Sequence, residues 1–241
     1  MTAKSLVAFL GLLLVGCGRA HVQTSQQGAA AALPRPAHVV VTDFAIDPSE
    51  VKLDSGVSAE FMRTASGTPL PDQLKQAAGA AQDALAERLA SRLTSYGLPV
   101  ERLPAKMTPP PGSLLVQGQI VSVDEGNRTR RTLVGLGAGK SSVGADVQLY
   151  YVTDPAQPLF LESFSGTADS GRMPGAAETM GAGAALSRFA TAAGTTAATH
   201  AAGETRRTGG AANAEDLADE LAKQIGAYAV KQGWIAASAV H

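Results

Sequence analysis

The stretch Gly135–Ser142 has the sequence GLGAGKSS and is similar to the phosphate-binding loop of nucleotide-binding proteins. That loop has a glycine, four further residues and a Gly-Lys-Ser/Thr triplet, so that backbone N–H groups and the lysine surround a phosphate. Gly139 and Lys140 would require the first glycine at position 134, where the chain has Val134. The loop should also lead into a helix, whereas the alternating pattern from Val143 predicts a strand. We therefore interpret the stretch as a connection between strands.

Basic side chains surround this stretch, namely Arg128, Arg130, Arg131 and Lys140. Two interpretations of them are open. The first is a solvated hairpin connection. The second is a contact with an anion or a partner, for which lipid headgroups, a cell-wall polymer or an acidic protein surface are candidates.

The residue types that commonly act in catalysis or bind metals are not arranged in any known catalytic motif in this chain. The histidines are not spaced with one another, or with Cys, Asp or Glu, as metal ligands are. No Gly-x-Ser-x-Gly sequence, the commonest signature of serine hydrolases, occurs in the chain. An acidic group follows the first predicted strand and is typical of a surface rim: Asp43, Asp47, Glu50 and Asp54. We predict no catalytic residue, no metal site and no cofactor.

Cys17 is the only cysteine of the chain and follows an uncharged run from Ser5 to Gly16. The run has the length of a signal-peptide core and is too short to span a bilayer as a helix. Residues 14–17 resemble the lipobox of bacterial lipoproteins, in which the cysteine receives a lipid and the preceding peptide is removed. We expect a signal peptide over residues 1–16 and a lipid anchor on Cys17. Gly18 in place of Asp after the cysteine indicates sorting to the outer membrane, facing the periplasm.

Composition predicts one domain behind this anchor. The formal net charge of −1 argues against a nucleic-acid partner, because such proteins normally have a basic surface. Residues 17–36 are small, polar and interrupted by proline, which predicts a flexible tether. We expect the domain over residues 37–235 and a C-terminal tail over residues 236–241.

Hydrophobic periodicity predicts four strands and two long helices in this domain. The helix signals are an apolar stripe with three- and four-residue spacing between Pro71 and Tyr96, and a second stripe that begins at a capping Asn213 and ends near Gly233. The order β-α-β-β-β-α predicts an α+β fold, with a mainly antiparallel sheet and helices on one face. The expected strands are His38–Ile46, Ser113–Asp124, Val143–Val152 and Leu159–Gly166.

An insertion rich in Gly and Ala occupies about residues 174–212. Small residues favour close helix packing, but Glu178, Arg188 and His200 argue against a membrane span. A mobile loop, a helix packed on a neighbour, and a segment for oligomerisation or membrane insertion all remain open.

The block GNRTRRTLVGLGAGKSSVGADVQLY, residues 126–150, and the closing QGWI, residues 232–235, resemble the bacterial lipoprotein family called domain of unknown function 4410. The fold plan is also similar to the curli secretion-channel lipoprotein, the lipoprotein activator of penicillin-binding proteins and the N-terminal domain of the translocation protein of the Tol system. These resemblances imply docking or assembly in the cell envelope and offer no catalytic residue.

Together these features predict a non-catalytic envelope lipoprotein that acts as a protein-binding or cell-wall-associated accessory or assembly factor. Its expected partners are a membrane, through Cys17, and an envelope protein or the cell wall. The alternative is an oligomeric lipoprotein that forms a scaffold or pore in the outer membrane.

Overall fold

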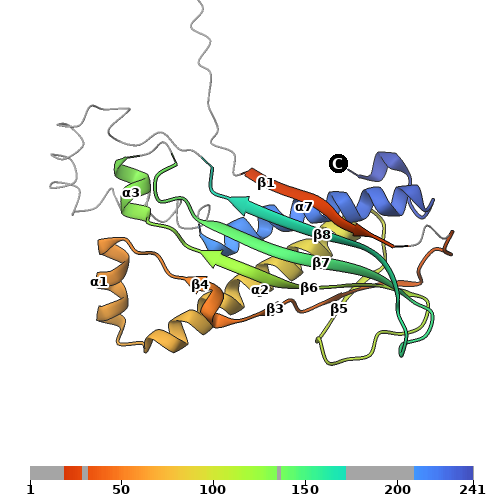
Figure 1. The fold of residues 1–241 in the computed structure, drawn as a ribbon, viewed down its shortest axis with the longest axis horizontal. Helices are drawn as coiled ribbons and strands as arrows, with labels where there is room; N and C mark the ends of the chain where they lie inside the picture. The colour runs from red at the N-terminus through yellow and green to blue at the C-terminus, as the bar shows by residue number, and fades with distance from the viewer. Residues whose placement is uncertain (1–18, 29–31, 135–136, 172–208, 241) are drawn as a thin grey trace, which may run out of the picture.

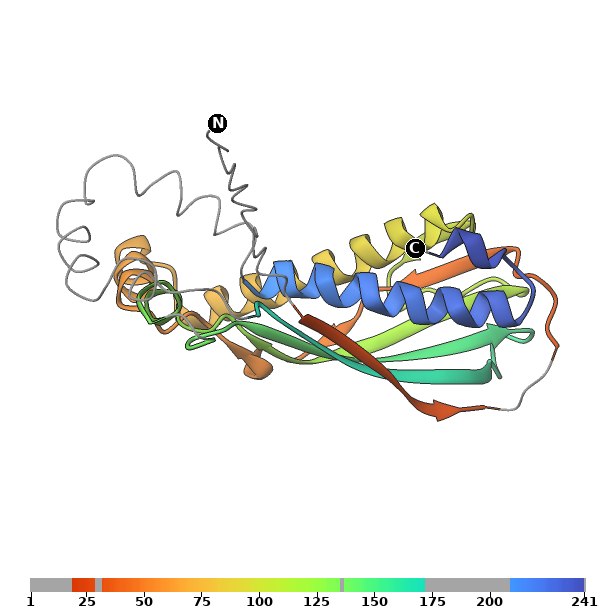
Figure 2. The same ribbon diagram turned by 90° about the horizontal axis from the view of Figure 1, so that it is seen from above.

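The computed structural model describes residues 19–28, 32–134, 137–171 and 209–240, which form two layers (Figures 1 and 2). One layer is a twisted sheet. The other consists of two long helices, α2 (Leu70–Ser95) and α7 (Gly210–Lys231), which lie side by side on one face of the sheet. The expected α+β class with helices on one face is confirmed.

The sheet has the strand order β1-β8-β7-β6-β2-β5, with β3 and β4 also paired to β6. Strands β6, β7, β8 and β1 pair antiparallel, whereas β2, β3 and β4 run parallel to β6 and β2 runs parallel to β5. The sheet is therefore mixed. The bounds of the strands are β1 Arg19–Gln27, β2 His38–Thr42, β3 Ala45–Ile46, β4 Val51–Lys52, β5 Val100–Leu103, β6 Ser113–Asp124, β7 Ser142–Val152 and β8 Leu159–Asp169. The shorter helices are η1 Pro48–Glu50, α1 Val57–Ser66, α3 Arg128–Leu133 and η2 Ala237–Ala239.

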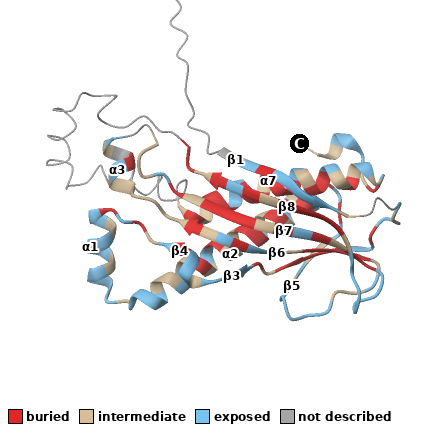
Figure 3. Ribbon diagram, viewed as in Figure 1, coloured by how far each residue is buried: buried red, intermediate tan, exposed pale blue. Residues whose placement is uncertain are grey.

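The core lies between the sheet and the two long helices (Figure 3). Strand β7 alternates as predicted, since its odd-numbered apolar residues are buried: Val143, Ala145, Val147, Leu149 and Tyr151. Helix α2 buries Leu85, Leu89 and Leu93 from the stripe that the sequence predicted. On the outer side of the helix layer, the Arg88 guanidinium donates to both carboxylate oxygens of Asp219, at 2.7 and 2.9 Å, and so links α2 to α7.

The sequence predicted a flexible tether over residues 17–36. This prediction was wrong for residues 19–27, which form β1 at the edge of the sheet. Arg19 pairs with Asp169 and Gln27 with Glu162, so the strand runs along most of β8. Val22 is buried and joins the core under α7. The strand is otherwise polar, which is why its sequence resembles a linker.

Three boundaries also differ from the prediction. Helix α7 begins at Gly210, so Asn213 is buried within its first turn instead of capping it, and the insertion ends before residue 210. The strand expected over residues 38–46 is divided into β2 and β3. Val41 pairs with Val116 but Ala45 pairs with Gln119, so the β2–β3 segment has one more residue than the part of β6 beside it. In the expected C-terminal tail, Val240 packs against the core.

This extra residue is accommodated by Gly118 on β6. A Cβ atom placed on Gly118 would lie 2.2 Å from the carbonyl oxygen of Asp146 and 3.1 Å from the ring of Phe44. Phe44 is fully buried, and the other neighbour is a backbone carbonyl of β7, which pairs with β6. The close approach of β6, β7 and the Phe44 ring thus requires glycine at this position.

We predict that Gly118→Ala lowers the free energy of unfolding by about 1–3 kcal/mol, since the added methyl forces the β6–β7 backbone apart. Gly79→Ala is the matched control: Gly79 lies within α2, and a methyl group added there would meet no atom within 4 Å. Alanine should stabilise the helix there by up to about 1 kcal/mol. Urea unfolding of both variants measures the difference, and equal stabilities would contradict the packing at Gly118.

Candidate functional site

Helix α3 and its flanking loops connect β6 to β7, where the sequence predicted a glycine-rich hairpin connection. Asn127 caps the helix, because its side-chain oxygen accepts a hydrogen bond of 2.8 Å from the Arg130 backbone N–H. Gly126 and Gly139 both have positive φ, and the Asn127 N–H donates to the Gly139 carbonyl at 2.9 Å. A Cβ on Gly139 would lie 2.4 Å from the Asn127 carbonyl oxygen. The glycines therefore allow two backbone segments to meet at the base of α3.

Arg131 is buried, with 2% of its surface exposed, and its predicted role as an accessible anion or partner contact was wrong. Its guanidinium Nη1 donates to the hydroxyls of Ser141 and Ser170, at 3.2 and 3.3 Å. The Asn213 side-chain amide donates to the same Ser141 hydroxyl at 2.9 Å. This cluster joins α3, the start of β7, the end of β8 and the first turn of α7.

The other three basic residues differ in exposure. The Lys140 ammonium lies 2.9 Å from the Asp169 carboxylate at the end of β8, and its side chain is 53% exposed. Arg128 is half-buried, with its Nε 3.8 Å from an oxygen of Asp54. Arg130 is exposed. The structure thus leaves Arg130 and Lys140 as the residues of the predicted set whose charges reach solvent most directly.

Asp54 connects α3 to α1. Its buried carboxylate accepts from the backbone N–H groups of Gly56, at 2.8 Å, and Arg128, at 3.2 Å. Its carbonyl oxygen accepts a hydrogen bond of 2.6 Å from the Arg63 guanidinium. We call the part of the molecule formed by residues 53–68, α3 and the ends of their flanking strands the α1–α3 end.

Helix α1 turns its apolar side away from the protein. No residue of α1 is buried, and Val57, Phe61 and Met62 are 76%, 71% and 67% exposed. These three residues lie on one side of the helix at 100° per residue, whereas Arg63 lies on the other side and bonds to Asp54. A surface helix normally faces its apolar side toward the core. In Figure 3, α1 is drawn almost entirely as exposed or intermediate.

The acidic residues that follow β2 do not converge on one site. Asp43 lies 2.8 Å from the Arg102 guanidinium, and Asp54 is committed to α1 and α3. Asp47 accepts from the Ser49 backbone N–H at 2.9 Å, and this hydrogen bond lowers the pKa of its carboxyl group. Asp47 and Glu50 line the first of two hollows beside β6, and Asp43 lines the second.

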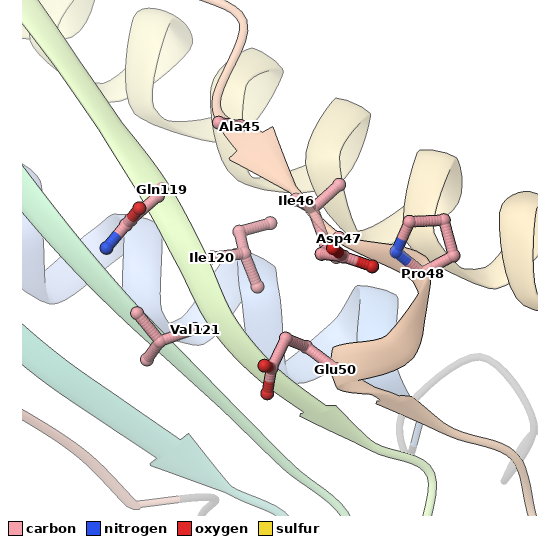
Figure 4. A pocket seen from close by; sticks show the side chains of 8 residues that line it. All are labelled: Ala45, Ile46, Asp47, Pro48, Glu50, Gln119, Ile120 and Val121. Atoms are coloured by element: carbon pink, nitrogen blue, oxygen red, sulfur yellow. The ribbon is translucent and has the colours of Figure 1, made fainter.

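The face of the sheet opposite α2 and α7, here called the open face, carries two adjoining hollows. The first, of ≈ 490 Å³, lies between β3, η1 and β6 (Figure 4). Gln119, Val121, Asp47 and Glu50 line it, and in Figure 4 the helices lie behind the strands. The second hollow, of ≈ 370 Å³, shares Gln119 and Ala45 with the first and adds polar side chains from β6 and β7: Gln117, Asp146 and Gln148.

No group of three or more His, Cys, Asp and Glu side chains that could hold a metal ion occurs among the described residues. Across the same residues, no helix combines the length and the apolar character needed to cross a membrane. Cys17 and most of the insertion expected at about 174–212 lie outside the described part of the chain.

Comparison with known proteins gives a family match and several distant structural likenesses. The family model described as "Domain of unknown function (DUF4410)" matches residues 39–187. No curated protein matches the chain. The PelC L103M dodecamer from Paraburkholderia phytofirmans is 17% identical over 69% of this chain and 92% of that chain, with a TM-score of 0.35. A second crystal form of the PelC dodecamer from the same organism is 16% identical over the same shares, with a TM-score of 0.33.

We predict that Arg131→Ala lowers the free energy of unfolding by about 2–4 kcal/mol, because it leaves the buried hydroxyls of Ser141 and Ser170 without this donor. Arg130→Ala, one residue away in the same helix, should change stability by less than about 0.5 kcal/mol because Arg130 is exposed. Chemical unfolding of the two variants tests this contrast. If both variants were as stable as the wild type, Arg131 would not have the structural role described above.

Proposed function

The chain belongs to the family described as a domain of unknown function (DUF4410), and from that premise we propose that it is a non-catalytic lipoprotein of the outer membrane. In this proposal Cys17 carries the lipid anchor and the domain faces the periplasm. The domain binds an envelope protein or cell-wall polymer as an accessory or assembly factor. The family description names no activity, so the support for this function comes from the surfaces of the domain itself.

The observation that carries the proposal is the open face of the sheet. A two-layer domain covers one face of its sheet with helices and leaves the other to solvent or to a partner. Here the two adjoining hollows bring the side-chain amides of Gln117, Gln119 and Gln148 to one surface. Each amide both donates and accepts hydrogen bonds, which fits the backbone of a protein strand and the hydroxyl and amide groups of a cell-wall polymer.

The surroundings of the carboxylates support docking over catalysis. Asp146 accepts a hydrogen bond of 2.6 Å from the Ser165 hydroxyl, and Asp43 is paired with Arg102. Asp47 has a lowered pKa and caps η1. A general acid at neutral pH needs a raised pKa, which is the opposite direction. These carboxylates are thus positioned to hold the walls of the hollows.

Replacement of Cys17 tests the anchor. In the full chain, Cys17→Ala should move the protein from the membrane fraction to the soluble periplasmic fraction, because the acyl chains provide most of the membrane affinity. Cell fractionation, together with the mass of the wild-type chain, measures the change. Wild-type fractionation of Cys17→Ala, or a wild-type mass without acyl chains, would contradict a lipid anchor.

Photo-crosslinking in cells tests the docking surface. A photoreactive amino acid in place of Val121, which is exposed beside the first hollow, should give a discrete adduct with an envelope protein or with peptidoglycan fragments. The same amino acid in place of Ala80, exposed on α2 in the opposite layer, is the matched control.

Digestion of the Val121 adduct with a muramidase distinguishes the two partner classes, since only a cell-wall adduct changes in size. An adduct between two copies of the chain would favour the alternative of an oligomeric scaffold. Equal labelling from positions 121 and 80 would contradict a docking role for the open face.

A further inference from the structure

The sheet register places α1, α3 and the start of β1 at one end of the sheet. Arg19 of β1 pairs with Asp169 of β8, which pairs with Ser142 of β7. Ser142 pairs with Asp124 of β6, which pairs with Lys52 of β4. Helix α3 lies between Asp124 and Ser142 in the chain, and α1 begins soon after Lys52. Figures 1 and 2 both show β1 starting in the half of the molecule that contains α1 and α3 and running away from them.

Strand β1 also sets how far this end can lie from a lipid on Cys17. Arg19 follows Cys17 by two positions in the sequence, and an extended chain spans at most about 3.5 Å per residue. Neighbouring strands are about 4.8 Å apart, so the row from β1 to β4 is about 20 Å wide. If Cys17 is acylated, as the proposed function requires, the bilayer lies close to the start of β1, at the end of the sheet that also carries α1 and α3.

The exposed chemistry of this end fits a lipid surface. Val57, Phe61 and Met62 form the outward side of α1, and Val134 just after α3 is also exposed. Helices that lie in a membrane interface bury such an apolar side at the level of the headgroups and acyl chains. The exposed Arg130 supplies positive charge beside α3, which attracts anionic headgroups.

We propose that the apolar side of α1 inserts into the interface of the bilayer that holds the lipid on Cys17. The domain then has a fixed orientation, with the α1–α3 end on the membrane and the open face directed along it, toward the periplasmic partner. This inference rests on the proposed lipid anchor and adds a second, non-covalent contact with the same membrane.

Depth-dependent fluorescence quenching tests this contact. The full lipidated chain carrying Phe61→Trp is reconstituted in vesicles of phosphatidylethanolamine and phosphatidylglycerol, with or without phosphatidylcholine brominated on its acyl chains. Tryptophan in the interface should show a blue-shifted emission and a loss of about half its intensity with the brominated lipid. The natural Trp234 is buried against Tyr151 and Tyr228, so the wild type gives the background signal.

Met107→Trp is the matched control, because Met107 is an exposed apolar residue in the connection between β5 and β6 at the far end of the sheet. It should show no more quenching than the wild type. The mass of the same preparation reports whether Cys17 is acylated.

An acylated chain in which Phe61→Trp is quenched no more than Met107→Trp would overturn the α1 contact and leave the lipid anchor intact. A chain without acylation would overturn both. A photoreactive residue at position 61 gives a further test, since it should yield lipid adducts. Adducts with another copy of the chain or with another protein, in place of lipid adducts, would also overturn the contact.

Discussion

The α1–α3 end depends on one buried cation, the guanidinium of Arg131. A buried charge is costly unless hydrogen bonds compensate for the lost water, and here the hydroxyls of Ser141 and Ser170 accept them. Because Ser141 and Ser170 stand just before β7 and just after β8, the cation fixes the ends of both strands. Asn213 brings the start of α7 to the same point. The cluster therefore holds the sheet and the helix layer together where α3 leaves the sheet.

Polar contacts continue outward from this cluster and explain how α1 can expose an apolar side. Most surface helices are held by burying apolar residues, so their outward side must be polar. Helix α1 is instead held on its inner side by the Asp54 carboxylate at its N-terminus and by the hydrogen bond from Arg63 to the Asp54 carbonyl. Its apolar residues are not buried in the domain, which leaves them available for a surface outside the protein.

The two long helices and the central strands could be predicted from the sequence, whereas the environment of the basic residues could not. The periodicity of β7 and α2 reflects burial on one side of each element, which is a local property of the sequence. The burial of Arg131 depends on Ser170 and Asn213, which are far away in the chain. One local signal was present: Asn127 as an N-cap predicts a short helix in which Arg130 and Arg131 point to different sides.

The expected tether also failed because of contacts with a distant part of the chain, and this failure matters more for function than the burial of Arg131. The strand β1 is polar because its support comes from β8, through hydrogen bonds such as Thr24 to Glu162 and Ser25 to Ser163. An edge strand of this kind has the composition of a linker, so composition alone cannot separate the two. A tether over residues 17–36 would let the domain move several nanometres from the membrane in any orientation. With β1 in the sheet, a lipid on Cys17 would hold one end of the domain at the bilayer, and the two exposed surfaces would then have different neighbours: α1 would face lipid, and the open face would face the periplasm.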